Sequence, residues 1–267
     1  MAAQTENTGN TGNTAKTESR SVTISTPDGA CDAFVAYPEG GGSHPAVLFY
    51  MDAIGLRPVL ENMARELASH GYYVLLPNLF YRHGKAPVAE LPDLSRPEGR
   101  EAFLAKIMPM VHELTPELGM RDAGCFLDFL AGQEEVRPGA VGLTGYCMGG
   151  VLSLRTAARY PDRVAAAASF HGGHLVTEAP DSPHRLAGDV EAELYFGHAS
   201  QDDSMNAGHI AELEAALAAA GTTYRSEVYP DTIHGFTMSD TAAYSEAGLA
   251  RHWDALLDLF ARTLKPA

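Results

Sequence analysis

The sequence contains little cysteine, and its three cysteines, Cys31, Cys125 and Cys147, form no closely spaced pair. So sparse and odd a set predicts neither a disulfide framework nor a CxxC metal site, and it fits a reducing compartment. No run of about 18 apolar residues is present, so no transmembrane helix is expected.

Lys and Arg number 19 against 34 Asp and Glu, a formal net charge of −15. Without a basic patch, neither nucleic acid nor a membrane is expected as a partner, and we predict a cytoplasmic protein.

The N-terminal segment, residues 1–20, has no continuous apolar stretch and is rich in Thr, Asn and Gly. It therefore does not read as a signal peptide, and it cannot bury enough surface to fold. We predict a disordered tail over 1–20 and a single domain over 21–267. Apolar residues make up 45% of the chain, which is ample for a buried core.

The rest of the chain alternates between short apolar runs, typical of strands buried on both faces, and patterns with helical spacing. The predicted strands are 21–26, 31–38, 46–51, 72–77, 140–145, 164–170, 191–197 and 224–229. The predicted helices are 58–70, 98–110, 116–132, 148–159, 206–220 and 243–264. The first two strands flank Pro-Asp-Gly, which indicates a hairpin.

This alternation predicts an α/β fold with a mostly parallel sheet, helices on both faces and an N-terminal antiparallel hairpin at one edge. A (β/α)₈ barrel is the competing architecture. It fits less well, because the hairpin and the long segment 78–132 break the regular alternation. Residues 78–100, rich in Pro, Gly and charge, are predicted to form a long loop, and a lid over the site is one use of it.

One cysteine lies among glycines in TGYCMGG, between a predicted strand and a predicted helix. Gly145, Cys147 and Gly149 match G-x-Nuc-x-G, the nucleophile elbow, in which the flanking positions must be small because helix and strand approach closely. The elbow places the thiol at a helix N-terminus, where the positive dipole end favours a thiolate. The N–H of Met148 would point at a developing oxyanion.

Other interpretations of this stretch remain open on its glycines alone. Gly142, Gly145 and Gly149 loosely match a dinucleotide-binding loop, and a cysteine can occupy a tight turn for packing. A single thiol has no redox partner. A nucleophile requires a base and an orienting acid, so partners for Cys147 decide the matter.

Suitable partners follow two later strands in the order nucleophile, acid, histidine. Asp202 and Asp203 follow the strand 191–197, and His234 follows the strand 224–229. The carboxyl ends of parallel strands are where active sites of open α/β sheets lie. Asp231 is interpreted as a turn residue.

Two further histidines form HGGH after the strand 164–170. His171 and His174 are conceivable as a metal pair, but no acid or thiol has regular spacing with them. His171 lies at a strand end, so we predict that it lines the substrate pocket, with an ordinary hydrogen-bonded loop histidine as the alternative. No metal and no organic cofactor is predicted.

With these residues in order, the sequence resembles the dienelactone hydrolase family, α/β-hydrolases with a Cys-Asp-His triad that open enol-lactones. The resemblance covers about residues 21–265 and rests on GYCMGG, QDDSM and HGF. It implies that Cys147 is the nucleophile, His234 the base and Asp202 the orienting acid, with Asp203 as the alternative acid.

The segment YMDAIGL is similar to the family's stretch after its third strand. The resemblance implies that Asp52 occupies the position of a carboxylate that sets the protonation of the cysteine. It also implies that the N–H of Ala53 is the second oxyanion donor, beside that of Met148.

The resemblance further implies a substrate-binding set. Arg82, in PNLFYRHG, matches an arginine that grips the substrate carboxylate. Met238 stands where the family has a second arginine, which predicts a substrate less charged or more apolar than a dienelactone. Tyr146, beside the nucleophile, and His171 complete the predicted substrate contacts.

The sequence thus predicts a cysteine-dependent hydrolase of lactones or small carboxylic esters, whose partner is a small-molecule substrate. A carboxylesterase or thioesterase of another substrate is the alternative, and so is a binding protein that kept the fold but lost efficient chemistry.

Overall fold

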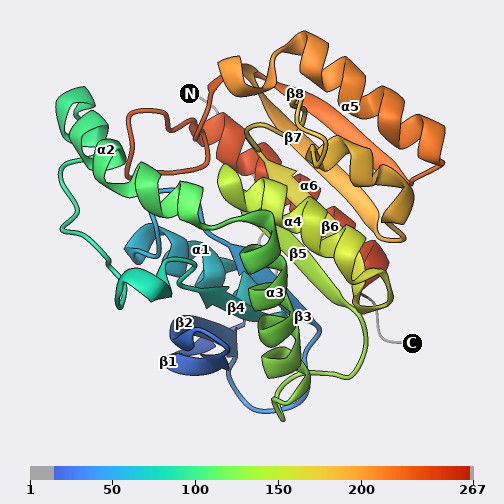
Figure 1. Cartoon of the computed structure of the whole chain (residues 1–267). Helices are drawn as coiled ribbons and strands as arrows, with labels where there is room; N and C mark the ends of the chain where they lie inside the picture. Colours follow the sequence, from blue (N-terminus) through green and yellow to red (C-terminus); the bar gives the residue numbers. More distant parts are fainter. Residues whose placement is uncertain (1–14, 265–267) are drawn as a thin grey trace, which may run out of the picture.

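The computed structural model describes residues 15–264. At its centre is an eight-stranded sheet in the order β1-β2-β4-β3-β5-β6-β7-β8 (Figure 1). The strands are β1 (Thr17–Thr26), β2 (Gly29–Pro38), β3 (Ala46–Tyr50), β4 (Tyr73–Pro77), β5 (Val141–Tyr146), β6 (Val164–Phe170), β7 (Glu193–Gln201) and β8 (Tyr224–Ile233). The β1–β2 and β2–β4 pairs are antiparallel and the others parallel. The sheet is open, with β1 and β8 at its edges, so the α/β prediction is confirmed and the barrel is excluded.

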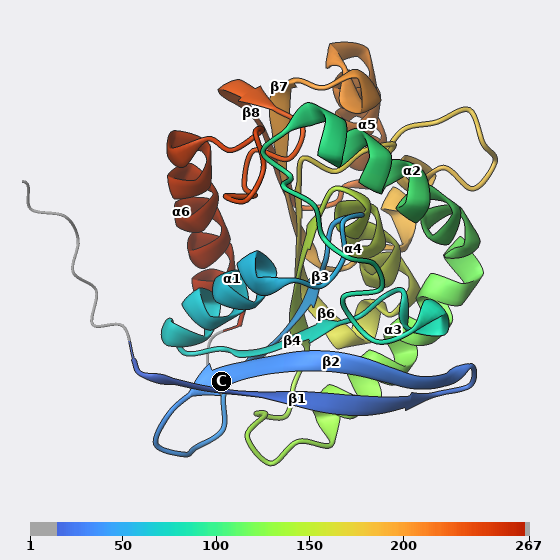
Figure 2. The same cartoon turned by 90° about the vertical axis from the view of Figure 1, so that its left-hand side faces the viewer.

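Helices cover both faces of the sheet (Figure 2). The helices α1 (Pro58–Ser69) and α6 (Glu246–Thr263) lie on one face, and α3 (Pro116–Ala131), α4 (Met148–Arg159) and α5 (Ala207–Ala220) lie on the other, with α2 (Pro97–Glu113) beyond them. Each packs an apolar side inward, as helical spacing requires. Within residues 15–264, no helix combines the length and the apolar character needed to cross a membrane.

The central strands β3, β4 and β5 are buried along their whole length. Helices on both faces leave these strands no solvent-facing side, which explains why their sequences are continuously apolar instead of alternating. The expectation of strands buried on both faces is therefore confirmed at the centre of the sheet.

The hairpin begins earlier than the sequence predicted. β1 starts at Thr17, which pairs with Pro38, and Arg20 pairs with Val35. The last part of the predicted tail therefore lies in the sheet, because backbone pairing with β2 compensates for its polar side chains. The part of that prediction covering residues 1–14 lies outside the described residues.

The strands β7 and β8 extend further than predicted, and this extension positions the site. They run to Gln201 and Ile233, which pair with each other across the ladder. Asp202 and His234, the next residues, therefore leave the sheet side by side. The apolar pattern alone ends the strands too early, because their last residues are polar or follow a bulge.

Candidate active site

Cys147 occupies the turn between β5 and α4 with φ 55° and ψ −117°, a conformation that residues other than glycine rarely adopt. The flanking glycines make this turn possible. A Cβ atom on Gly145 would lie 1.9 Å from the carbonyl oxygen of Gly149. A Cβ atom on Gly149 would lie 2.5 Å from the carbonyl oxygen of Tyr50, at the end of β3. The structure thus has the predicted nucleophile-elbow geometry.

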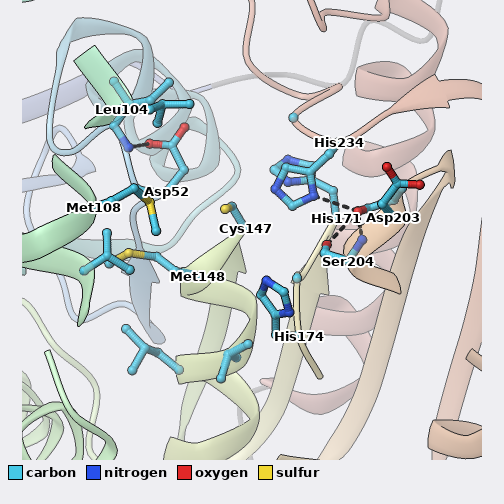
Figure 3. Close-up of a pocket in the computed structure, with 18 of the residues that line it drawn as sticks. Asp52, Leu104, Met108, Cys147, Met148, His171, His174, Asp203, Ser204 and His234 are labelled. Atoms are coloured by element: carbon cyan, nitrogen blue, oxygen red, sulfur yellow. Dashed lines mark hydrogen bonds and ion pairs between the residues drawn. The ribbon is translucent and has the colours of Figure 1, made fainter. Parts of the chain in front are cut away.

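The thiol of Cys147 is partly exposed and lines a cavity. Cys147 is also the N-cap residue of α4, so the free N–H groups of the first helical turn and the positive end of the helix dipole lie beside it. In Figure 3, Cys147 lies between His234 and Ser204 on one side and Met148 and Asp52 on the other. The position combines exposure to the cavity with proximity to the positive end of a helix dipole.

His234 and Asp202 are joined by a short hydrogen bond. The Nδ1 atom of His234 lies 2.6 Å from Oδ2 of Asp202, whose side chain is only 3% exposed. The other carboxylate oxygen accepts hydrogen bonds from the backbone N–H and the hydroxyl of Ser204, at 2.9 and 2.6 Å. Asp202 is therefore held on both oxygens, which fixes the orientation of the imidazole.

The pKa of His234 reflects its two partners. Burial lowers the pKa, but the interactions of the ring with Asp202 and Cys147 outweigh burial and raise it to about 10. Burial likewise raises the pKa of Asp202, and the contacts with His234 and Ser204 outweigh it and hold that pKa below its usual value. The contacts with Asp202 and Cys147 thus favour a protonated imidazole on His234.

The competing acids do not reach the histidine in this way. Asp203 is exposed and forms part of the cavity wall. Asp231 is also exposed and has φ 56°, which fits the predicted turn residue. The geometry therefore selects Asp202 as the partner of His234.

The two residues predicted as oxyanion donors, Ala53 and Met148, both line the cavity. Gly149, next to Met148, packs directly on the backbone of Tyr50 and Met51 at the end of β3. Met148 is the first residue of α4, and the first N–H groups of a helix lack intrahelical acceptors.

Asp52 is buried, and its carboxylate is bound by an arginine that the sequence did not single out. Arg57 donates to both oxygens of Asp52, at 2.7 and 3.0 Å. Arg57 is itself 2% exposed and donates from Nε to Asp240 at 2.7 Å. Asp52 thus neutralises a buried arginine that ties the end of β3 to the loop carrying His234. Asp52 also lines the cavity. Its predicted influence on the protonation of Cys147 stays a proposal.

The cavity beside Cys147 has a volume of about 790 Å³. Leu104, Met108 and Val111, one face of α2, form an apolar wall. The predicted pocket residues His171 and Met238 line it as well. None of the described residues among 78–100 lines the cavity, whereas α2 forms part of its wall.

His171 is buried and donates to or accepts from the hydroxyl of Thr237, at 2.8 Å from Nε2. Burial and the neighbouring His234 lower the pKa of His171 well below its usual value, which favours the neutral form of its ring. His174 is exposed and also lines the cavity. Within residues 15–264, no cluster of three or more His, Cys, Asp or Glu side chains is arranged to hold a metal ion.

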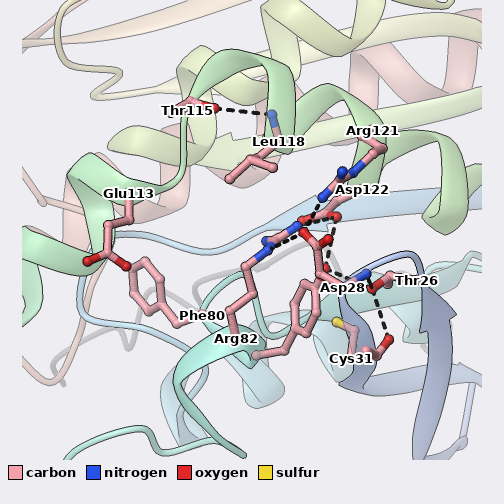
Figure 4. A network of polar contacts seen from close by, with 12 residues as sticks. Thr26, Asp28, Cys31, Phe80, Arg82, Glu113, Thr115, Leu118, Arg121 and Asp122 are labelled. Carbon is pink, nitrogen blue, oxygen red and sulfur yellow. Dashed lines mark hydrogen bonds and ion pairs between the residues drawn. The ribbon is translucent and has the colours of Figure 1, made fainter.

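Arg82 and Tyr146, two predicted substrate contacts, do not line the cavity among the described residues. The guanidinium of Arg82 donates to both oxygens of the buried Asp122, at 2.8 Å each, and to Asp28 (Figure 4). It joins α3 to the β1–β2 hairpin. We therefore assign Arg82 no contact with substrate.

Tyr146 points to the opposite face of the sheet. Its hydroxyl lies 2.7 Å from Nε2 of His252 in α6. Successive residues of a strand face opposite sides, so the residue before the elbow turns away from the cavity. Tyr146 is a core residue.

Sequence reasoning missed three residues of the site. Ser204 fixes Asp202, and its place two residues later in DDSM was a usable signal for a side-chain turn. Arg57 gave no signal, because its partner Asp240 is 183 residues away. Arg155, on α4, lines the cavity eight residues after Cys147.

The open sheet, the elbow and the acid and histidine at strand ends define an α/β-hydrolase. Among solved structures, a dienelactone hydrolase-like promiscuous phosphotriesterase from metagenomic libraries shares the fold, with a TM-score of 0.79 at 22% identity. The match covers 94% of this chain and 100% of that one.

The chain belongs to the dienelactone hydrolase family, whose model matches residues 31–264. A "Putative carboxymethylenebutenolidase" of Methylorubrum extorquens is 27% identical over 243 residues, covering 90% of this chain and 79% of that protein. A "Carboxymethylenebutenolidase" of Rhodococcus opacus is 26% identical over 226 residues, covering 84% and 83%. The resemblance drawn from the motifs is confirmed, and the chain is a carboxylic ester hydrolase of the dienelactone hydrolase type.

Proposed function

We propose that this hydrolase cleaves lactones or small carboxylic esters through an acyl-enzyme on Cys147. The observation that carries the proposal is the 2.6 Å contact between Nδ1 of His234 and Oδ2 of Asp202, beside the strained elbow of Cys147. Nucleophile, base and orienting acid come from the ends of three strands. Such a triad is recognised by geometry and by the role of each member.

In the first half of the reaction, the sulfur of Cys147 forms a bond to the carbonyl carbon, and the carbonyl π electrons move to oxygen. When this oxyanion collapses, the carbon–oxygen bond to the alcohol breaks. The departing alkoxide takes the proton from Nε2 of His234, and a thioester with Cys147 remains. In a lactone the alcohol stays attached to the acyl part.

In the second half, water gives a proton to His234 while its oxygen attacks the thioester carbon. Collapse breaks the carbon–sulfur bond, the electron pair returns to Cys147 as a thiolate, and a carboxylic acid is released. The imidazolium is regenerated, and Asp202 stabilises it in both halves. The N–H groups of Met148 and Ala53, both in the cavity wall, are proposed to hold the oxyanion.

The chemistry of the thiol supports esters and lactones as substrates. A thiolate is a better leaving group than an amide nitrogen, so a tetrahedral intermediate on an amide would return to reactants. The apolar wall of α2 and the presence of Met238 support a partly apolar substrate. A carboxylesterase or thioesterase acting on another acyl group would use the same residues.

Hydrolysis of p-nitrophenyl butyrate, followed at 400 nm, tests the proposal. We expect Cys147→Ala to lower kcat/KM by about 10³-fold or more, because the nucleophile is lost. Cys125→Ala is the matched control, since this second partly exposed thiol does not line the cavity among the described residues. Full activity of Cys147→Ala would rule out Cys147 as the nucleophile, whereas a wild-type protein without ester hydrolysis would favour the binding-protein alternative.

A further inference from the structure

The imidazole of His234 needs more than one contact to stay in place. Its hydrogen bond with Asp202 holds the Nδ1 atom, but the rest of the ring can still swing about that atom. Such a swing would carry Nε2, the proton donor of the proposed mechanism, away from Cys147. The side chain is also 28% exposed, so packing encloses only part of it. The residues that pack on the ring therefore decide where Nε2 lies.

The segment after β6 packs on this ring. The ring of His171 lies edge to face against that of His234, with centroids 5.3 Å apart and planes at 66° (Figure 3). Gly173 lies close as well, because a Cβ atom there would be 3.5 Å from Cε1 of His234. The end of β6 thus limits how far the imidazole can swing on this side.

His171 is itself held in place. It is 1% exposed, and its backbone N–H donates to the carbonyl oxygen of Gly197 in β7 at 2.8 Å. Its Nε2 atom lies 2.8 Å from the hydroxyl of Thr237, three residues after His234 on the same loop. Its Nδ1 atom has no hydrogen-bond partner within residues 15–264, so Thr237 alone among their polar side chains orients the ring. The contact joins the end of β6 to the loop that carries the base.

Two further features of His171 suit this place. Its φ of 38° is one that residues other than glycine rarely adopt, and such strain persists only where the surrounding contacts impose it. Burial and the nearby His234 lower the pKa of His171, which favours a neutral ring. A second cation would repel the imidazolium of His234, whereas a neutral ring can pack against it.

We infer that His171 is a positioning residue: held by Thr237, its ring keeps the imidazole of His234 in the orientation that links Asp202 to Cys147. This inference rests on the proposed function. It gives His171 a part in the chemical step through another residue and no part in binding the substrate. Loss of His171 should therefore lower kcat and leave KM nearly unchanged.

Hydrolysis of p-nitrophenyl butyrate by His171→Ala tests the inference. Without the ring the imidazole can swing, and a misplaced reacting group costs rate, so we expect kcat to fall about 10- to 100-fold. KM should stay within about threefold of the wild-type value. The low-field proton NMR resonance of Nδ1–H in His234, assigned by its loss in Asp202→Asn, should broaden or disappear.

Thr237→Val is the second variant, because it removes the hydroxyl and keeps a side chain of similar shape. It should lower kcat about 3- to 10-fold, the value of one hydrogen bond, and it decides the question if His171→Ala does not fold. His198→Ala is the matched control. His198 is another buried histidine, 2% exposed, but it is not among the described residues that line the cavity. Its loss should change neither kcat nor the resonance.

The outcomes separate the two proposals. An unchanged kcat in either His171→Ala or Thr237→Val overturns the inference and leaves the proposed function standing. A rise in KM at constant kcat does the same, because it would make His171 a substrate contact. An equal loss of kcat in His198→Ala also overturns it, since that result would reflect general loosening of the core. A wild-type protein that hydrolyses no ester would contradict the proposed function itself.

Discussion

The Nδ1 atom of His234 is hydrogen-bonded to the carboxylate of Asp202, which is almost fully buried. Asp202 is 3% exposed on its side chain and is fixed by Ser204, so it keeps its charge and its direction. A buried anion next to an imidazole stabilises the imidazolium, which explains why the pKa of His234 is raised to about 10 despite burial. At the residue scale, the acid thus sets the protonation of the base.

The pH profile should report this directly. Because the protonated imidazole is the form favoured below a pKa of about 10, we expect kcat/KM to fall as pH rises through about 10. In Asp202→Asn the negative charge is gone, the pKa of His234 drops, and the alkaline limb moves to lower pH. The profile is measured between pH 6 and 11 with p-nitrophenyl butyrate, after correction for spontaneous hydrolysis.

Asp203→Asn supplies the control for this profile. Asp203 is exposed and one residue away, so its loss should leave the alkaline limb within about half a pH unit. A limb that moves equally in both variants, or only in Asp203→Asn, would show that Asp202 is not the orienting acid.

At the scale of the elements, the elbow depends on three segments that touch through backbone atoms. The start of α4 packs on the end of β3 and beside β5 with no space for a methyl group. This contact fixes the position of Cys147 relative to the end of β3. Rigid elements hold a reacting group more accurately than a loop does.

Gly149→Ala tests this contact. A Cβ atom there would lie 2.5 Å from the carbonyl oxygen of Tyr50, and backbone cannot yield cheaply, so we expect a loss of about 1–3 kcal/mol in the free energy of unfolding. Displacement of Cys147 should also lower kcat by tenfold or more. Chemical denaturation and ester hydrolysis measure the two effects.

Gly188→Ala is the matched substitution, because a Cβ atom at Gly188 meets nothing within 4 Å. It should change stability by less than about 0.5 kcal/mol and leave kcat unchanged. If Gly149→Ala behaved like Gly188→Ala, close packing at the elbow would not be what positions the thiol.

At the scale of the whole molecule, the sequence predicted the architecture and placed Cys147, Asp202 and His234 after three strands, because both follow from local patterns. Apolar runs such as β3 and the glycines around Cys147 have physical requirements that can be recognised one segment at a time. The register that pairs Gln201 with Ile233 has no such local mark, so the strand ends were placed too early.

Long-range partners account for the other differences. Arg82 was assigned to substrate from its motif, but Asp122 and Asp28, on distant segments, take its guanidinium. Met238, in place of an arginine, led us to predict a less charged substrate. Among the described residues, however, an arginine from another element, Arg155 of α4, lines the cavity. Charge in a pocket depends on which segments meet there, and a single motif cannot show that.

The intact mass of the protein during turnover tests the central claim most directly. Protein mixed with excess p-nitrophenyl butyrate and quenched in acid within the first turnovers is analysed by mass spectrometry and then by peptide mapping. The account predicts a gain of one butyryl group, located on the peptide containing Cys147 and absent from Cys147→Ala. Steady turnover with an acyl group on another residue, or an adduct that persists without being hydrolysed, would contradict it.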